Sequence, residues 1–365
     1  MRLLEQRRVL TQIHPYIPGK PISHVQRELG LSYVSKMASN ENPLGCSPKA
    51  TEAVRRWADN MALYPDGSCS ELNAAVSSKL GIKQEQLLFG AGSDQIVEMI
   101  AQAYINPDDE AIMPIPSFPR YETVTRIMDG KPVEIKLDSN FRLDLSAYAA
   151  SFTNKTRIVW ICNPNNPTGT IITFNEQQSF LKDVPESVLV VLDEAYYEYA
   201  RGENYPESIN LLEKHSNIII LRTFSKVFGL AGLRVGYAIS SPEIISNLNK
   251  VRAPFNVNTA AQVAALAALT DEDFLNKSIE TNRTGKLYLY EAFNDLGLSY
   301  IPTHANFVMV NLNCNSQDVF NTLLREGIIV RPGIPFGMPG WIRLTIGAPE
   351  ENRRFIEALR KIMKR

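Results

Sequence analysis

Apolar residues gather in short runs between about residues 86 and 222, and each run has the length of a β-strand. Several runs are apolar throughout, without alternation, as in parallel strands covered by helices on both faces. Segments with helical spacing, residues 94–105 and 176–184, separate some of the runs. The five runs lie at residues 86–90, 111–115, 157–161, 188–195 and 217–221. This alternation predicts an α/β fold with a mainly parallel sheet.

The pattern changes near residue 282, where a long helical segment begins. Short strand-like runs and a terminal helix follow it, which predicts a second, smaller α+β domain. The helical segment, the three runs and the terminal helix lie at residues 283–297, 306–312, 327–333, 341–347 and 350–365.

The first forty residues contain Pro15, Pro18, Gly19 and Pro21 and predict an extended arm. We therefore expect three parts in the chain. The first is residues 1–40, an arm that also contributes to the small domain. The others are a large α/β domain at residues 41–270 and a small α+β domain at residues 271–365.

The composition is that of an ordinary soluble protein, with 365 residues, of which 44% are hydrophobic and 21% charged. The net charge is −1 and like charges form only short clusters, so we expect no nucleic-acid partner. The most apolar helical stretch, residues 260–269, is too short to span a bilayer, and we expect a cytoplasmic protein without a membrane partner. The four cysteines lack paired spacing and nearby histidines, so we expect neither disulfides nor a metal site.

Polar or glycine-rich segments follow or end four of the apolar runs: GAGSDQ, NPNNPTG, DEAYYEY and RTFSK. In open α/β sheets ligands bind at the carboxyl ends of the strands, so four such ends on one sheet predict one site. The glycines and Ser93 begin a helix, where N–H groups favour a phosphate, although an ordinary helix cap fits equally well. Asp193 ends a buried run, where it needs a cationic partner; a cofactor nitrogen and a structural salt bridge are both possible.

Lys226 follows an apolar run in the segment LRTFSKVFGLAGLRVGYAIS, and Arg234 lies eight residues later. Desolvation in such a place lowers the pKa of a lysine and favours the reactive neutral amine. A surface lysine in a loop is the alternative for this residue taken alone.

In chain order, NPNNPTG, DEAYYEY and TFSKVFGLAGLRVGY resemble the signatures of fold-type I pyridoxal-phosphate-dependent aminotransferases. With HPYIPGKPISHVQRELGL, ASNENPLG and LYPDG, the chain is most similar to the histidinol-phosphate aminotransferases, a class II group of that family. The resemblance continues to RLTIGAPEEN and so covers essentially the whole chain. It implies a mainly parallel seven-stranded sheet covered by helices, a smaller α+β domain, and pyridoxal 5'-phosphate as cofactor.

The resemblance also implies a role for each matching residue. Lys226 would bind the cofactor covalently and later move a proton between the substrate carbon and the cofactor. Asp193 would pair with the ring nitrogen, and Asn166 and Tyr196 would hydrogen-bond the phenolic oxygen. Arg234, with Thr223, Ser225 and Ser93, would hold the cofactor phosphate, and Gly92 and Asp94 would also bind the cofactor.

Two aromatic residues match cofactor-binding positions of the family. Phe118 falls where an aromatic ring stacks on the pyridine ring; many relatives have tyrosine there, and a core phenylalanine is the alternative. Tyr64 would reach the cofactor phosphate of the neighbouring subunit in a homodimer with shared active sites, whereas its alternative is a tyrosine in a turn.

Four residues match substrate-binding positions. Arg343 would bind the anionic group of the substrate with help from Arg331, and a surface salt bridge is the alternative for both. Tyr16 would close over the substrate as part of the arm, and Asn42 would contact it.

The resemblance implies transamination of L-histidinol phosphate with 2-oxoglutarate, giving imidazole acetol phosphate and glutamate in histidine biosynthesis. The partners would be a small-molecule amino donor, a 2-oxo acid and a second copy of the chain. An aromatic amino acid aminotransferase is an open alternative, and so is a decarboxylase or lyase of the same fold.

Overall fold

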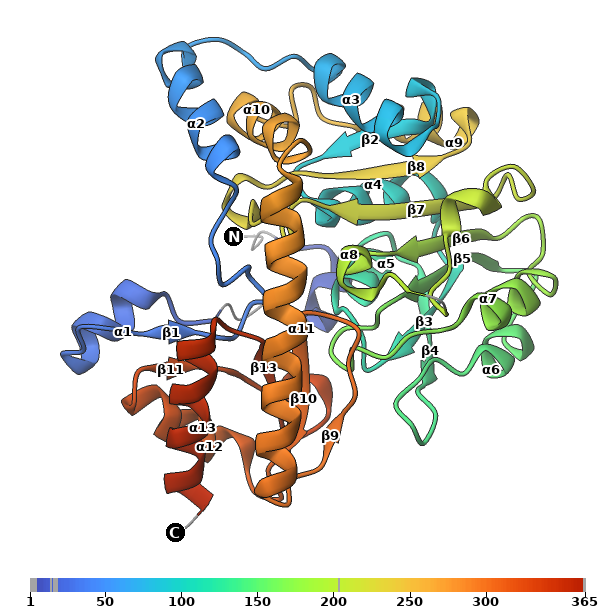
Figure 1. Ribbon diagram of the computed structural model, residues 1–365. Helices are drawn as coiled ribbons and strands as arrows, with labels where there is room; N and C mark the ends of the chain where they lie inside the picture. The colour runs from blue at the N-terminus through green and yellow to red at the C-terminus, as the bar shows by residue number, and fades with distance from the viewer. Residues whose placement is uncertain (1–4, 14, 16–18, 203, 364–365) are drawn as a thin grey trace.

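The computed structural model describes residues 5–13, 15, 19–202 and 204–363. Its larger part contains a seven-stranded sheet in the order β2-β8-β7-β6-β5-β3-β4 (Figure 1). Neighbouring strands are parallel, except that β8 is antiparallel to both β2 and β7. The strands are β2 (Leu87–Gly90), β3 (Glu110–Ile115), β4 (Lys131–Lys136), β5 (Thr156–Cys162), β6 (Leu189–Asp193), β7 (Ile218–Thr223) and β8 (Gly236–Ser240). The predicted mainly parallel, seven-stranded α/β fold is confirmed.

Both faces of this sheet are covered by helices, so successive strand residues enter two different buried clusters. On β6, Val190 and Leu192 pack in one cluster, and Leu189 and Val191 in the other. The first face is covered by α2 (Pro48–Trp57), α3 (Ser70–Leu80), α6 (Leu145–Ala150), α7 (Phe174–Leu181) and α10 (Thr259–Ala268). The second is covered by α4 (Ser93–Tyr104), α5 (Arg120–Ile127) and α9 (Pro242–Val251). Burial on both faces explains the unbroken apolar runs.

All five apolar runs form strands, but the hydrophobic pattern did not indicate β4 or β8. Strand β4 is an edge strand in which charged residues alternate with apolar ones, and it has no fully buried residue. Strand β8 begins with glycine and ends with serine, although its neighbours bury it completely. Their places in the sheet, rather than their composition, make these two segments strands.

The smaller part combines a four-stranded antiparallel sheet, in the order β12-β13-β10-β9, with three helices. Its core lies between the two layers. The strands are β9 (Tyr300–Ile301), β10 (Phe307–Asn311), β12 (Arg331–Pro332) and β13 (Trp341–Thr345), and the helices are α11 (Glu272–Asp295), α12 (Ser316–Arg325) and α13 (Pro349–Met363). Helix α11 runs from the larger part down to the smaller one (Figure 1).

Two predictions about these segments need correction. The long helix begins at Glu272 rather than near residue 283, because the side chain of Asp271 accepts the backbone N–H of Phe274 and caps it there. The run at residues 327–333 is divided between two sheets, since β11 (Ile328–Ile329) pairs with β1 (Ser35–Lys36) while β12 pairs with β13.

The amino-terminal segment is also less extended than its prolines suggested. Pro21 directly precedes helix α1 (Ile22–Leu29), and Gly30 ends the helix with φ of 65°. Val25 of this helix packs against Ile329, which joins the segment to the smaller part. The boundaries at residues 40 and 270 stay predictions. Among the residues described, no helix is both long and apolar enough to cross a membrane.

Candidate active site

Three of the four segments singled out in the sequence meet at one edge of the large sheet. Strands β5, β6 and β7 are adjacent and parallel, with Cys162 in register with Asp193, and Asp193 with Leu221. Backbone hydrogen bonds continue beyond the strands, from Asn163 N–H to Asp193 O at 2.9 Å and from Glu194 N–H to Leu221 O at 2.9 Å. The carboxyl ends of these three strands therefore lie side by side at one edge of the sheet.

Arg234 connects the fourth segment, at the start of α4, to these strand ends. Gly92 has φ of +78°, and a Cβ atom there would overlap the guanidinium of Arg234, so only glycine lets the arginine lie against the helix start. Arg234 Nη1 in turn donates to Ser225 Oγ at 3.3 Å. The Ser225 N–H donates to Thr223 Oγ1 at 3.1 Å. Helix N–H groups at Ser93, a guanidinium and hydroxyls converge, which is a donor set for an anion.

Asp94 stands in the first turn of α4, but its carboxylate turns to another partner. Arg120 Nε donates to Asp94 Oδ1 at 2.9 Å, and the same guanidinium also pairs with Glu98. An acidic residue in the first turn is favourable for the helix itself. A cofactor contact of Asp94 stays a prediction.

Lys226 lies in the centre of the site. Its Nζ is 3.5 Å from Ser39 O and 5.4 Å from the ring centre of Tyr196. Burial lowers the pKa of Lys226 to about 8, and the positive charges of Arg343 and Arg234 act in the same direction. A neutral amine is therefore well populated near pH 8.

Asp193 is buried at the end of β6. Its Oδ2 accepts the hydroxyl proton of Tyr121 at 2.7 Å, and its Oδ1 accepts the N–H of Ala195 at 3.2 Å. Burial raises the pKa of Asp193, while these two hydrogen bonds and the charge of Lys226 oppose the shift. The carboxylate is held in place by neutral donors.

Tyr196 and Asn166 are both tied to residues distant in sequence. The Tyr196 hydroxyl accepts a hydrogen bond from Asn40 Nδ2 at 3.0 Å. Asn166 Oδ1 accepts Arg343 Nη1 at 2.6 Å, and Arg343 Nη2 donates to Ala38 O at 2.8 Å. The arginine thus links the smaller part of the molecule to the NPNNPTG segment of the larger part.

Arg343 is buried and its guanidinium lies among aromatic rings. The ring centres of Phe307 and Phe336 are 5.4 Å and 5.3 Å from its Cζ atom, within the range of cation–π attraction. Arg331 is the register partner of Arg343 on the neighbouring antiparallel strand. Directly opposite residues share one face of a sheet, so two positive side chains start from the same place.

Phe118 precedes α5 and is partly buried at the edge of the cluster on that face of the sheet. Its ring meets Tyr121 edge to face, with ring centres 5.6 Å apart. Contact with a cofactor ring stays a prediction.

Two of the remaining predicted residues have contacts that the structure describes. Tyr64 is 82% exposed and stacks on Phe255 with ring centres 4.8 Å apart. Asn42 is buried, and its amide donates to Val227 O at 2.7 Å and to Ser278 Oγ at 2.9 Å, so it holds the chain after Lys226 against α11. Tyr16 lies outside the described residues. Substrate contacts of Asn42 and Tyr16 stay predictions.

Sequence reasoning missed Tyr121 and Asn40 as members of the site. Tyr121 could have been found, because it lies three residues after Phe118 at the start of a helix, where such positions share a face. Asn40 stands in ASNENPLG with φ of 57°, and its side chain reaches Tyr196 only because the amino-terminal segment folds back over the sheet. No local pattern marks that contact.

Comparisons with known proteins identify the family of this chain. The family described as "Aminotransferase class I and II" matches residues 33–359. The histidinol-phosphate aminotransferase of Caldicellulosiruptor saccharolyticus is 50% identical, over 98% of this chain and 99% of its own. That of Moorella thermoacetica is 53% identical, over 98% of this chain and 92% of its own. The structure of the Sinorhizobium meliloti histidinol-phosphate aminotransferase with pyridoxal-5'-phosphate superposes with a TM-score of 0.90 at 26% identity, covering 99% of this chain and 98% of that one.

Identity of this extent, over nearly the full length of both chains, is decisive for the family. Its members are pyridoxal-phosphate-dependent aminotransferases, so this chain is an enzyme of that kind. The chain belongs to the class I and II aminotransferases and, within them, to the histidinol-phosphate aminotransferases.

Proposed function

We propose that this enzyme transfers the amino group of L-histidinol phosphate to 2-oxoglutarate and so forms imidazole acetol phosphate and glutamate in histidine biosynthesis. The observation that carries the proposal is the 50% and 53% identity to histidinol-phosphate aminotransferases along the whole chain. The arrangement of Arg343 and Arg331 supports the choice of a substrate that carries a phosphate group.

The residues of the site fit pyridoxal phosphate. The start of α4 with Arg234 and Ser225 offers donors to a phosphate, and the missing Cβ of Gly92 gives them room. The buried carboxylate of Asp193 would hold a protonated ring nitrogen, and the hydroxyl of Tyr196 near Lys226 and the amide of Asn166 would be hydrogen-bonding groups for the phenolic oxygen. When bound, the cofactor supplies an electron sink for negative charge at the substrate carbon.

Lys226 performs two tasks in this proposal. As a neutral amine it would hold the cofactor, and as a base it would move a proton from the substrate carbon that bears the amino group to the cofactor. Its pKa of about 8 suits both tasks, because a base acts best when its pKa lies near the working pH.

Arg343 and Arg331 supply the site for the substrate's anionic group. The two residues are register partners on adjacent strands, so a dianionic phosphate could form charge-assisted hydrogen bonds with both of them. The planar guanidinium also matches a carboxylate, so the same residues can admit glutamate or 2-oxoglutarate in the second half-reaction. Tyr16 and Asn42 would complete this substrate site, with Tyr16 closing over the substrate.

We further propose a homodimer with shared active sites. Tyr64, Met61, Leu63 and Phe255 are large apolar side chains on the surface, exposed by 82%, 70%, 69% and 47% respectively. A patch of this kind supports an interface, through which Tyr64 would reach the cofactor phosphate of the second copy. Mixing Tyr64→Ala with Lys226→Ala subunits should then restore activity, because some mixed sites carry both native residues. A fully active monomer in sedimentation would exclude the shared site.

We place the enzyme in the cytoplasm. Its four cysteines are free thiols, including the exposed Cys314, as is usual in a reducing compartment.

The substrate is tested by comparing kcat/KM for histidinol phosphate with the values for phenylalanine and tyrosine, with 2-oxoglutarate as acceptor. We expect histidinol phosphate to be preferred. Arg331→Ala should lower kcat/KM for histidinol phosphate more than kcat/KM for phenylalanine. The reason is that a phosphate dianion loses more electrostatic attraction than a carboxylate does. A higher kcat/KM for an aromatic amino acid would overturn the proposed substrate but not the proposed cofactor chemistry.

A further inference from the structure

Tyr121 is locked in one position beneath the site. Its side chain is 1% exposed, and its ring stacks on Trp160 with centres 4.8 Å apart and an interplanar angle of 11°. Phe118 also meets this ring edge to face, with ring centres 5.6 Å apart. Two aromatic neighbours therefore hold the ring, and its hydroxyl donates to Asp193 Oδ2 at 2.7 Å.

This hydrogen bond connects a neutral donor to a buried acid. Burial raises the pKa of Tyr121 well above its usual value, and the charge of Asp193 adds to the shift, so the phenol stays protonated and stays a donor. A hydrogen bond to an ionised acceptor is stronger than one to a neutral acceptor. The phenol therefore favours the carboxylate form of Asp193 over the carboxylic acid.

Other groups face the same carboxylate. Ala195 donates its N–H to Oδ1, Lys226 favours the ionised form, and Asp94 opposes it. The thiol of Cys162 is also close, and burial raises its pKa to about 12, so it is neutral at physiological pH. Tyr121 is the side chain that touches Asp193 directly and can be altered by removing a single oxygen atom.

We propose that Tyr121 is a positioning residue that fixes the Asp193 carboxylate and favours its ionised form, so that the proton shared with the cofactor's ring nitrogen stays on the nitrogen. The inference rests on the proposed binding of pyridoxal phosphate above Asp193. Without the phenol, Asp193 would be a stronger base and would take that proton, so that a bound cofactor would be a weaker electron sink.

The test uses Tyr121→Phe, reconstituted as holoenzyme with nitrogen-15-labelled pyridoxal phosphate. The nitrogen resonance should move toward the value of an unprotonated pyridine. The kcat for histidinol phosphate should fall about 10- to 100-fold, the size expected for one hydrogen bond to a charged group, with little change in KM. An unchanged resonance in a folded, cofactor-loaded variant would overturn the inference.

Tyr148→Phe is the matched control. Tyr148 is also fully buried, but its hydroxyl donates to Trp160 O at 3.3 Å rather than to Asp193. Its removal also deletes one buried hydroxyl beside Trp160, so the resonance and kcat should stay at wild-type values. A shift as large as that of Tyr121→Phe would mean that general loosening of the core is the cause, and would overturn the inference.

A double variant separates positioning from structure. In an Asp193→Asn background, Tyr121→Phe should cost no further activity, because the group through which Tyr121 acts is gone. Additive losses would contradict the inference, and this comparison remains valid even if Tyr121→Phe binds the cofactor more weakly. Failure of the proposed function is seen separately in the wild type, as protein that loads the cofactor but does not transaminate histidinol phosphate.

Discussion

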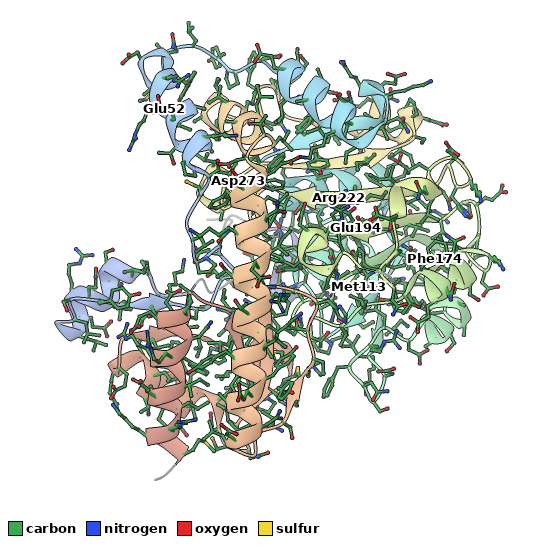
Figure 2. All side chains as sticks on the ribbon, in the orientation of Figure 1. Glu52, Met113, Phe174, Glu194, Arg222 and Asp273 are labelled. Carbon is green, nitrogen blue, oxygen red and sulfur yellow. The ribbon has the colours of Figure 1, made fainter. Side chains whose placement is uncertain are left out.

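Asp193 and Glu194 follow one another at the end of β6 and end in opposite environments. Asp193 points toward α5, where neutral donors hold it. Glu194 points to the other face, where Arg222 donates to its Oε2 from Nε at 3.0 Å and from Nη2 at 2.9 Å. Figure 2 shows Glu194 and Arg222 side by side. The Arg222 guanidinium also lies 3.4 Å from the ring centre of Tyr197.

The two environments separate function from structure. A buried carboxylate needs compensation for lost hydration, and Glu194 has it permanently from an arginine, with both side chains at most 3% exposed. Among the described residues, no lysine or arginine forms an ion pair with Asp193 within 4.0 Å. Burial raises the pKa of both acids. A protonated ring nitrogen can complete the environment of Asp193, whereas that of Glu194 is already complete.

The largest effect is expected for Glu194→Gln. It leaves the buried Arg222 without its counter-charge, so the free energy of unfolding should fall by about 3–5 kcal/mol. Urea unfolding of the apo protein at fixed concentration measures this. Glu52→Gln is the control, because Glu52 forms an exposed pair with Arg56 and its loss should cost less than about 1 kcal/mol. Equal losses in the two variants would refute the structural role of Glu194.

Asp193→Asn should have the opposite profile. We expect kcat/KM to fall about 100- to 1000-fold, since the proposed function puts this preorganised charge beside the cofactor and the variant removes it. The apo protein should keep its stability within about 1 kcal/mol, because asparagine can still accept the hydrogen bond from Tyr121. Steady-state kinetics and urea unfolding of the same preparation test both parts. An unstable but active variant would make Asp193 a structural residue like Glu194.

Lys226 extends the comparison to a second buried ionisable group of the candidate site. With its pKa lowered to about 8, roughly half of the amine is neutral at pH 8, about 100-fold more than for an ordinary lysine. Covalent uptake of pyridoxal phosphate by the apo protein should therefore rise with pH and level off above a midpoint near 8. Borohydride reduction and peptide mass analysis locate the adduct, with Lys226→Ala as the control. A midpoint in the ordinary lysine range would show that burial does not tune this amine.

Tyr197→Phe should give the smallest effect. The ring that faces Arg222 remains, and only the hydroxyl bonds to Glu207 at 2.7 Å and 2.9 Å are lost. We expect unfolding to become easier by about 1–2 kcal/mol with kcat unchanged. Tyr197→Leu also removes the cation–π contact and should cost more. A drop in kcat for Tyr197→Phe would show that the surroundings of Glu194 and Arg222 also affect catalysis.

The sequence by itself determined much of the fold and the sheet edge at which the candidate site lies. Five apolar runs predicted five strands of the sheet, because burial on both faces leaves a local and unbroken signal. Their polar ends, including Lys226 and Asp193, predicted a common site, because parallel strands end at the same edge. Strands β4 and β8 carried no such signal, since an edge position and a glycine weaken it.

Only the tertiary structure decided what each site residue touches. Asp193 and Glu194 are adjacent acids with the same local sequence, and the side of the strand on which each lies separates them. The partner of Asn166 is Arg343, 177 residues away, and that of Tyr196 is Asn40, 156 residues away. Such contacts depend on how the smaller part and the amino-terminal segment pack over the sheet, and no periodicity along the chain encodes that packing.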